Sequence, residues 1–190
     1  MGSSITKEFR VKGMICSRCL KVLNSELSAI GAEVLQIELG KFVIKYNPRL
    51  VKKSHILKVV LENEFELIYD ETKVLAESTK QCVIRYVWDS DHRVKLSQYL
   101  VRRLNYKYSY LSGIFTKTYN LSIERYFILL KIERIKELIE NGQLSFSEVA
   151  YKVGYQNLSA LSRQFKIETG MTMKEYKNLG RSLRTPIDKI

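Results

Sequence analysis

The stretch "SFSEVAYKVGYQNLSALSRQFKIETGMTMKEY", residues 145–176, decides the fold of the C-terminal half. Ser145 and Glu148 have the spacing of a capping box, which starts a helix. Gly154 then opens a turn, and apolar residues recur at helical spacing through residues 158–169. The pattern predicts a helix-turn-helix, whose second helix can enter the major groove of B-DNA.

The same pattern occurs 50 residues earlier, in "KLSQYLVRRLNYKYSYLSGIFTKTYNLSIERY", residues 95–126. This offset aligns Asn120 with Gly170, and both residue types tolerate the left-handed conformation at a helix end. An internal repeat indicates two copies of one supersecondary unit, which we place at about 95–119 and 145–169. It also aligns identical residues, of which the aromatic ones are predicted to be core: Leu111 with Leu161, Ser112 with Ser162, Phe115 with Phe165, and Tyr126 with Tyr176.

A long amphipathic helix is predicted between the two units, at about residues 122–141. It starts at a Ser122 cap, ends before Gly142, and carries a stripe of isoleucines at positions 128, 132, 135 and 139. Such a helix is roughly 27 Å long. Successive major grooves on one face of DNA lie roughly 34 Å apart, so this helix could hold two recognition helices in neighbouring grooves.

Positive charge is concentrated in the same half of the chain. The 190 residues carry a net charge of +12. Residues up to Lys80 hold 13 Lys and Arg against 10 Asp and Glu, whereas the remainder holds 19 against 10. The C-terminal half is therefore expected to meet a polyanion, and nucleic acid is the leading candidate.

The N-terminal part, residues 1–72, shows an alternation of strand and helix patterns. Strand patterns lie at 8–13, at 32–48 as two strands around a Gly40-Lys41 turn, and at 65–70, and helix patterns lie at 20–31 and 51–64, with Ser54 as a candidate cap. The order βαββαβ is that of the ferredoxin-like fold. We therefore predict an α+β ferredoxin-like domain followed by an all-α double helix-turn-helix domain at 73–190, joined through a helix-prone segment at 69–81.

Two cysteines, Cys16 and Cys19, lie in the loop between the first strand and the first helix. Helix-end N–H groups, Arg18 and Lys21 favour the thiolate, which binds metal or attacks disulfides. Two thiolates without a nearby His suit a soft ion that takes few ligands, such as Cu(I), whereas zinc requires about four ligands. Cys82 lies in an apolar helical segment and is expected to be a buried thiol.

"GMICSRC", residues 13–19, resembles the Gly-Met-x-Cys-x-x-Cys signature of the heavy-metal-associated domain of copper chaperones and metal-transporting ATPases. The resemblance covers about residues 7–70. It implies that Cys16 and Cys19 are the metal ligands and that Met14 packs inward to support the loop. Ile15 and the bulky Arg18 depart from the usual pattern.

Residues 74–178 resemble the AraC/XylS-type DNA-binding domain, which has two helix-turn-helix units joined by a long helix. Gly113 departs from the family pattern, in which an arginine often occurs, and Met173 replaces a common proline. Arg163 is the strongest single candidate for a DNA contact, with a structural ion pair to Glu148 or Glu168 as the alternative. The candidate DNA-binding residues are Lys107, Tyr108, Ser109, Tyr110, Ser112, Gly113, Asn157, Leu158, Ser159, Ser162, Arg163 and Lys166.

These features predict a transcription regulator that binds double-stranded DNA and responds to Cu(I) or another soft metal ion. The alternatives are a regulator whose N-terminal domain serves dimerisation or docking, a thiol-redox sensor, and a metal chaperone. RNA polymerase and a second copy of the chain are further candidate partners. No catalytic triad, phosphate loop or acid pair occurs, so an enzyme is not expected. The cysteine count and the lack of a long apolar run predict a cytoplasmic protein without a membrane span.

Overall fold

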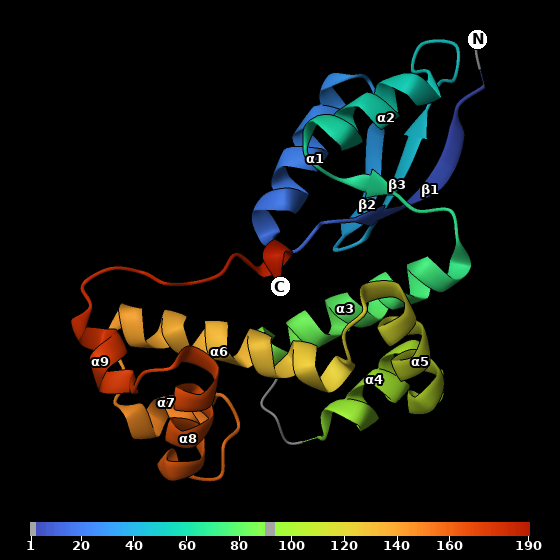
Figure 1. Ribbon diagram of the computed structural model, residues 1–190. Helices are drawn as coiled ribbons and strands as arrows, with labels where there is room; N and C mark the ends of the chain where they lie inside the picture. The colour runs from blue at the N-terminus through green and yellow to red at the C-terminus, as the bar shows by residue number, and fades with distance from the viewer. Residues whose placement is uncertain (1–2, 90–93) are drawn as a thin grey trace. The chain divides into compact units, whose positions relative to one another are not determined.

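The computed structural model describes residues 3–89 and 94–190 of the chain. The chain divides into two compact units, Met1–Gln81 and Cys82–Ile190. The boundary between them falls inside helix α3, Glu71–Asp89 (Figure 1). This helix contains most of the segment 69–81 that was predicted to be helix-prone.

The first unit follows the predicted order of strands and helices. Its elements are β1 Ile5–Lys12, α1 Ser17–Ala29, β2 Glu33–Glu38, β3 Lys41–Tyr46, α2 Lys53–Glu62 and β4 Glu66–Leu67. The strands form one antiparallel sheet in the order β2-β3-β1-β4. The last strand is much shorter than the predicted 65–70, because only Glu66 and Leu67 pair with β1.

The core of this unit lies between the sheet and the two helices. Phe9 stacks on Phe42 with ring centroids 5.0 Å apart, and Met14 is fully buried, as the family resemblance implied. On β2 the inward residues Val34 and Ile37 break the strict alternation of a strand. A bulge between Val34 and Gln36 explains the break, since it shifts the register by one residue.

Helix α2 starts without the predicted Ser54 cap. Its N-cap is Lys52, which makes no side-chain cap hydrogen bond, and Ser54 lies in the first turn. Helix α1 ends as expected: Gly31 follows the C-cap Ile30 with a φ of +90°, a conformation that favours glycine.

The second unit contains the two predicted pairs of helices and the long helix between them. The first pair is α4 Leu96–Leu104 and α5 Tyr108–Tyr119, and the second is α7 Phe146–Lys152 and α8 Leu158–Thr169. Helix α6 runs from Ile123 to Asn141, with Ser122 accepting a hydrogen bond from the Arg125 N–H and Gly142 in the left-handed conformation. Helix α9, Met173–Asn178, and a short 3-10 turn, Ile187–Lys189, complete the unit.

The repeat predicted from the sequence is confirmed in three dimensions. Helices α5 and α8 have the same length and start 50 residues apart. Asn120 and Gly170 end these helices in the left-handed conformation, with φ of 53° and 76°. The aligned apolar residues are all buried: Leu111, Leu161, Phe115, Phe165, Tyr126 and Tyr176.

Several charged side chains on α6 are also buried, which the sequence pattern did not predict. Glu133 and Lys136 form an ion pair at 2.7 Å, and the C-terminal segment provides further hydrogen-bond partners for both side chains. Lys136 donates to the carbonyl of Leu183 at 3.0 Å, and Glu133 accepts from the N–H of Thr185 at 2.8 Å. The segment after α9 is thereby held against α6.

Cys82 lies on α3 and is buried, as predicted. Burial raises the pKa of its thiol. Within residues 3–89 and 94–190, the helices are all too short or too polar to span a lipid bilayer.

Candidate nucleic-acid interface

Helix α8 is the second helix of the C-terminal helix-turn-helix, and its start is fixed by local chemistry. Gly154 turns the chain after α7 with a φ of +71°. The N-cap Asn157 then accepts a hydrogen bond from the Ala160 N–H at 2.9 Å through its side-chain oxygen. The amide nitrogen of Asn157 is the part of this side chain that remains for a DNA contact.

Arg163 and Lys166 lie exposed on α8. The alternative role of Arg163, an ion pair with Glu148 or Glu168, does not occur among the described residues. Glu168 instead pairs with Arg125 at 2.6 Å and accepts from Gln164 at 3.0 Å. The guanidinium of Arg163 is therefore free to reach a phosphate or a base edge.

The remaining candidates on α8 differ in their exposure. Ser159 is exposed, and Ser162 is half-buried. Leu158 is half-buried and packs against the core of the second helix pair, so only part of its side chain is left for a contact with DNA.

In the first helix pair, α5 presents a surface with little charge. Its N-cap Lys107 is exposed and makes no side-chain cap hydrogen bond. Ser109, Tyr110 and Gly113 are exposed, and Ser112 is half-buried. A Cβ atom added at Gly113 would meet nothing within 4 Å, so this part of the helix surface is open.

Tyr108 is used within the protein. Its hydroxyl donates to the carboxylate of Glu124, which ties the start of α5 to the start of α6. Burial raises the pKa of Tyr108 far above its ordinary value, and the bond to Glu124 and its negative charge add to this effect. The hydroxyl is therefore a structural donor, and only the ring is left for contact with DNA.

Tyr106 was missed by sequence reasoning and belongs to the same surface. Its ring stacks on that of Tyr110 with centroids 5.6 Å apart, and the two residues are 47% and 50% exposed. The signal was the four-residue spacing of the two tyrosines, which places side chains next to each other when helical geometry extends into the turn. The pair gives the first unit an exposed aromatic surface.

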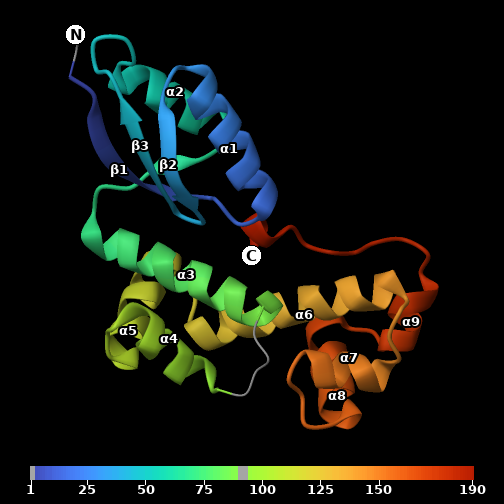
Figure 2. The same ribbon diagram turned by 180° about the vertical axis from the view of Figure 1, so that it is seen from behind.

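Helix α6 joins the two units, and α5 and α8 lie near its opposite ends (Figure 2). Its 19 residues span about 28 Å. Lys131 lies buried on this helix, with its ammonium 3.7 Å from the ring centre of Tyr155 and 5.2 Å from that of Phe127. Burial lowers the pKa of Lys131 to about 8. This residue links the turn of the second unit to the middle of α6.

In the first unit of the chain, Cys16 and Cys19 lie together at the start of α1. Cys16 is the N-cap residue, and the two sulfur atoms are 3.3 Å apart. Partial burial raises the pKa of Cys16, but hydrogen bonds from the backbone and thiol of Cys19 and from the backbone of Arg18 outweigh burial and lower it overall. Burial raises the pKa of Cys19, and the neighbouring sulfur of Cys16 adds to this rise.

The donor set of this loop consists of two sulfur atoms. Within the described residues, no group of three or more His, Cys, Asp or Glu side chains could hold a metal ion. Two thiolates fit a soft ion of low coordination number, such as Cu(I), and they do not complete a four-ligand zinc site.

Comparison with known proteins places the C-terminal region. Residues 100–179 match the helix-turn-helix domain family. The chain is 31% identical over 133 residues to the Msm operon regulatory protein of Streptococcus mutans. The match covers 67% of this chain and 46% of that protein. YdiP of Escherichia coli, an uncharacterized HTH-type transcriptional regulator, is 26% identical over 95 residues, which are 50% of this chain and 31% of YdiP. The chain thus spans less than half the length of these curated relatives.

A solved structure shares the fold of the same region. The C-terminal domain of AraT, a response regulator from Geobacillus stearothermophilus, has a TM-score of 0.51 with 21% sequence identity. The likeness covers 59% of this chain and 91% of that domain. The resemblance of residues 7–70 to heavy-metal-associated domains stays a prediction. The C-terminal part of the chain is an all-helical helix-turn-helix domain with the fold of the AraT C-terminal domain.

Proposed function

We propose that the protein is a transcription regulator that binds double-stranded DNA through α5 and α8, placed in neighbouring major grooves. The observation that carries this proposal is the repeated helix pair on one linker helix, with an exposed Arg163 on the second recognition helix that forms no ion pair among the described residues. The curated relatives and the fold indicate a DNA-binding regulator and not an enzyme. The net positive charge of the C-terminal half supports the same function.

The DNA-binding proposal is tested by replacing Arg163. Duplexes selected from a random pool by the full chain provide the specific site, and affinity is measured at several salt concentrations. Arg163→Ala should weaken binding to the selected site by roughly 5- to 100-fold, the range for loss of one bidentate base contact. Arg49→Ala, which removes the same charge from the N-terminal unit, is the matched control.

Two outcomes would contradict the assignment. Equal losses for Arg163→Ala and Arg49→Ala would reduce the role of Arg163 to general charge. Unchanged binding of Arg163→Ala at moderate salt would remove it from the interface. A change in the salt slope without a change in sequence preference would assign it to a phosphate.

We further infer that residues 1–72 are a ferredoxin-like domain whose Cys16 and Cys19 bind Cu(I). The βαββαβ order and the sheet order β2-β3-β1-β4 support the fold. The short distance between the sulfur atoms, the lowered pKa of Cys16 and the buried Met14 beneath the loop support the site. Binding at these thiolates would change DNA affinity by a coupling free energy of roughly 1 to 3 kcal/mol, and the coupling would be reciprocal.

A reversible disulfide between the same two cysteines is the second candidate. The 3.3 Å separation of the sulfur atoms favours it, since a small movement would bring them to bonding distance. A purely structural or dimerising domain and a metal chaperone are the remaining alternatives. The chaperone explains least, because metal delivery does not require two helix-turn-helix units. RNA polymerase and a second copy of the chain are proposed partners in a cytoplasmic setting.

The N-terminal proposal is tested by anaerobic Cu(I) titration of the reduced protein against a colorimetric chelator. Tight one-to-one binding is expected, with loss in the Cys16→Ser/Cys19→Ser double variant and retention in Cys82→Ala, which keeps the loop intact. Equal weak binding by all three proteins would overturn metal binding. DNA affinity of the oxidised and reduced chain, measured without metal, then tests the disulfide.

A further inference from the structure

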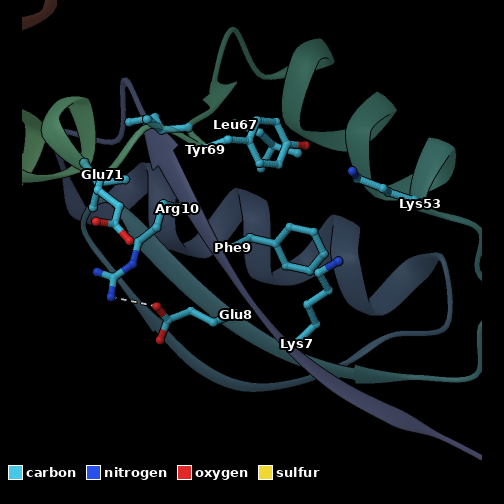
Figure 3. Close-up of a pocket in the computed structure, with 10 residues that line it drawn as sticks. Lys7, Glu8, Phe9, Arg10, Lys53, Leu67, Tyr69 and Glu71 are labelled. Carbon is cyan, nitrogen blue, oxygen red and sulfur yellow. Dashed lines mark ion pairs between the residues drawn. The ribbon is translucent and has the colours of Figure 1, made fainter.

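The first unit contains a cavity of about 420 Å³ beside the outer edge of β1 (Figure 3). It exists because β4 pairs with only Val11 and Lys12, while the N–H of Ile68 donates to the carbonyl of Arg10. Residues 5–9 of β1 therefore have β3 on one side and, within the described part of the chain, no strand on the other. The connection from β4 to α3 and the start of α2 form the other walls.

One end of this cavity combines two ammonium groups with two aromatic rings. The Lys53 ammonium lies 5.0 Å from the ring centre of Tyr69, and the Lys7 ammonium lies 5.7 Å from that of Phe9. Neither lysine forms an ion pair with a carboxylate among the described residues. Their charge is therefore balanced only by ring faces and solvent.

The other end of the cavity is already neutralised. Arg10 pairs with Glu8 at 2.6 Å, and Figure 3 shows Glu71 on the same side as this pair. An anion entering the cavity is thus drawn to the lysine end. The start of α2 lies there, and its first N–H groups receive no side-chain acceptor from the N-cap Lys52, which adds the positive end of a helix dipole.

The walls at the lysine end define the shape of the ligand as well as its charge. Tyr69 is 70% exposed, so most of its ring surface is open to a ligand. The ring of Phe9 is packed in the core with its neighbour Phe42 and offers a fixed apolar wall. A ligand with a flat apolar body could cover the ring of Tyr69 and touch the edge of Phe9, which is 4% exposed, while its charged group stays between the lysines.

We propose that this cavity binds a small organic anion, a carboxylate on a flat aromatic body, held by Lys7 and Lys53 against Phe9 and Tyr69. The volume allows such a ligand, since a cavity of about 150 Å³ accepts benzene and typical ligand pockets begin near 300 Å³. The site is separate from Cys16 and Cys19 and from the helix-turn-helix units. It does not depend on the function proposed above.

The test uses a matched pair of probes, 2-naphthoate and its neutral analogue 2-naphthamide, with the reduced and metal-free full chain labelled with ¹⁵N. Naphthoate should shift the backbone amide signals of Phe9, Lys53 and Tyr69 in a saturable way. A Kd of about 1 mM or tighter is expected for a probe of this size. Naphthamide should bind several-fold more weakly, because it keeps the ring and loses the charge.

Variants of the lysines assign the charge recognition. Lys7→Gln and Lys53→Gln should each weaken naphthoate binding by roughly three- to tenfold and leave naphthamide binding unchanged. Lys58 lies on α2, as Lys53 does, but it pairs with Glu62 outside the cavity. Lys58→Gln should therefore have no effect on the binding of either probe. All three positions are solvent-exposed, so the substitutions leave the core intact.

Four results would overturn the proposal. The first is no saturable shift with naphthoate at millimolar concentration. The second is equal affinity for both probes, which would exclude recognition of charge. The third is a set of shifts confined to residues away from the cavity. The fourth is equal weakening of naphthoate binding by Lys53→Gln and Lys58→Gln.

Discussion

The two helix-turn-helix units have similar backbone conformations but are stabilised by different local interactions. In the second unit, Ser145 and Glu148 form a capping box before α7, and Asn157 caps α8. In the first helix-turn-helix, the N-cap residues of α4 and α5 are Lys95 and Lys107, and neither makes a side-chain cap hydrogen bond. The first unit therefore depends on packing and on the bond from Tyr108 to Glu124 for an orientation that the second unit encodes locally.

The same comparison distinguishes the two surfaces that we propose to face DNA. Gly113 in the first unit is the positional equivalent of Arg163 in the second. The first recognition helix and the turn before it present the stacked pair Tyr110 and Tyr106, whereas the second recognition helix presents Arg163 and Lys166. The first helix-turn-helix thus has an aromatic surface with little charge, and the second has a cationic surface with hydrogen-bond donors. Sequence discrimination is expected mainly from the second.

The largest expected effect comes from the aligned core phenylalanines. Phe115 and Phe165 are 1% and 0% exposed, so replacement of either by alanine should lower the free energy of unfolding by about 3–5 kcal/mol. The single tryptophan, Trp88, donates a hydrogen bond to Glu137 on α6 at 3.1 Å. Its fluorescence therefore reports urea unfolding of the C-terminal part of the chain, residues 82–190.

If α6 couples the two helix pairs into one cooperative transition, both variants should shift the Trp88 midpoint by similar amounts. A shift for Phe165→Ala with none for Phe115→Ala would show that the first helix pair unfolds independently. Leu35→Ala, at an exposed position in the N-terminal unit, is the control.

A smaller effect is expected at Lys131, the buried ammonium between α6 and the turn of the second unit. Its pKa is lowered from 10.5 to about 8 by burial, so the unfolded chain binds the proton more tightly between these pH values. Stability should therefore rise as pH increases from 8 to 10.5. The rise is at most about 3 kcal/mol, because the ring of Tyr155 at 3.7 Å favours the charged form.

Lys131→Met should abolish this rise and raise the stability at neutral pH. Tyr155 does not interfere in the folded state, since burial raises its pKa to about 12. Urea unfolding followed by Trp88 at pH 7.5, 9 and 10 compares the two proteins. Parallel pH profiles would mean that Lys131 is charged throughout and held by the aromatic rings.

Features set by neighbours in the chain were predictable from the sequence. The ends of α6 at Ser122 and Gly142 and the box of Ser145 and Glu148 follow from residue types at fixed spacings. The repeat itself was visible because equivalent core positions in the two helix pairs require the same large side chains. Periodicity likewise gave the order of strands and helices in the N-terminal unit.

Features set by distant parts of the chain were not predictable. The pairing of Arg125 with Glu168 joins residues 43 positions apart, and the partners of Glu133 and Lys136 lie in the C-terminal segment. Sequence spacing therefore could not show that Glu168 forms an ion pair with Arg125 or that charged residues of α6 are buried. The cavity beside β1 depends on where β4 stops, which local propensity does not fix.

The cap of α8 gives a matched pair of smaller effects. Asn157→Ala should cost about 1 kcal/mol, because it removes the acceptor for the Ala160 N–H. Lys107→Ala at the equivalent place in the first unit should cost almost nothing, since Lys107 makes no cap bond.

Asn157→Ser separates stability from DNA contact. Serine restores an acceptor for the cap and lacks the amide nitrogen, so stability should return to nearly that of the unmodified chain. If the amide contacts DNA, binding to the selected site stays weakened in Asn157→Ser. Full recovery of both stability and binding would assign Asn157 to capping alone.

The smallest effect is expected at Gly113. Glycine within a helix is less favourable than alanine by about 0.5–1 kcal/mol, and a Cβ at this position meets no atom within 4 Å. Gly113→Ala should therefore stabilise the C-terminal part of the chain, residues 82–190, by about this amount, measured by urea unfolding with Trp88 as the probe. Unchanged DNA affinity would mean that Tyr106 and Tyr110 provide the contacts of the first unit. A loss of affinity would mean instead that the backbone at Gly113 lies directly against the DNA. The first helix-turn-helix would then recognise the groove by close approach of its backbone, whereas the second would recognise it through Arg163.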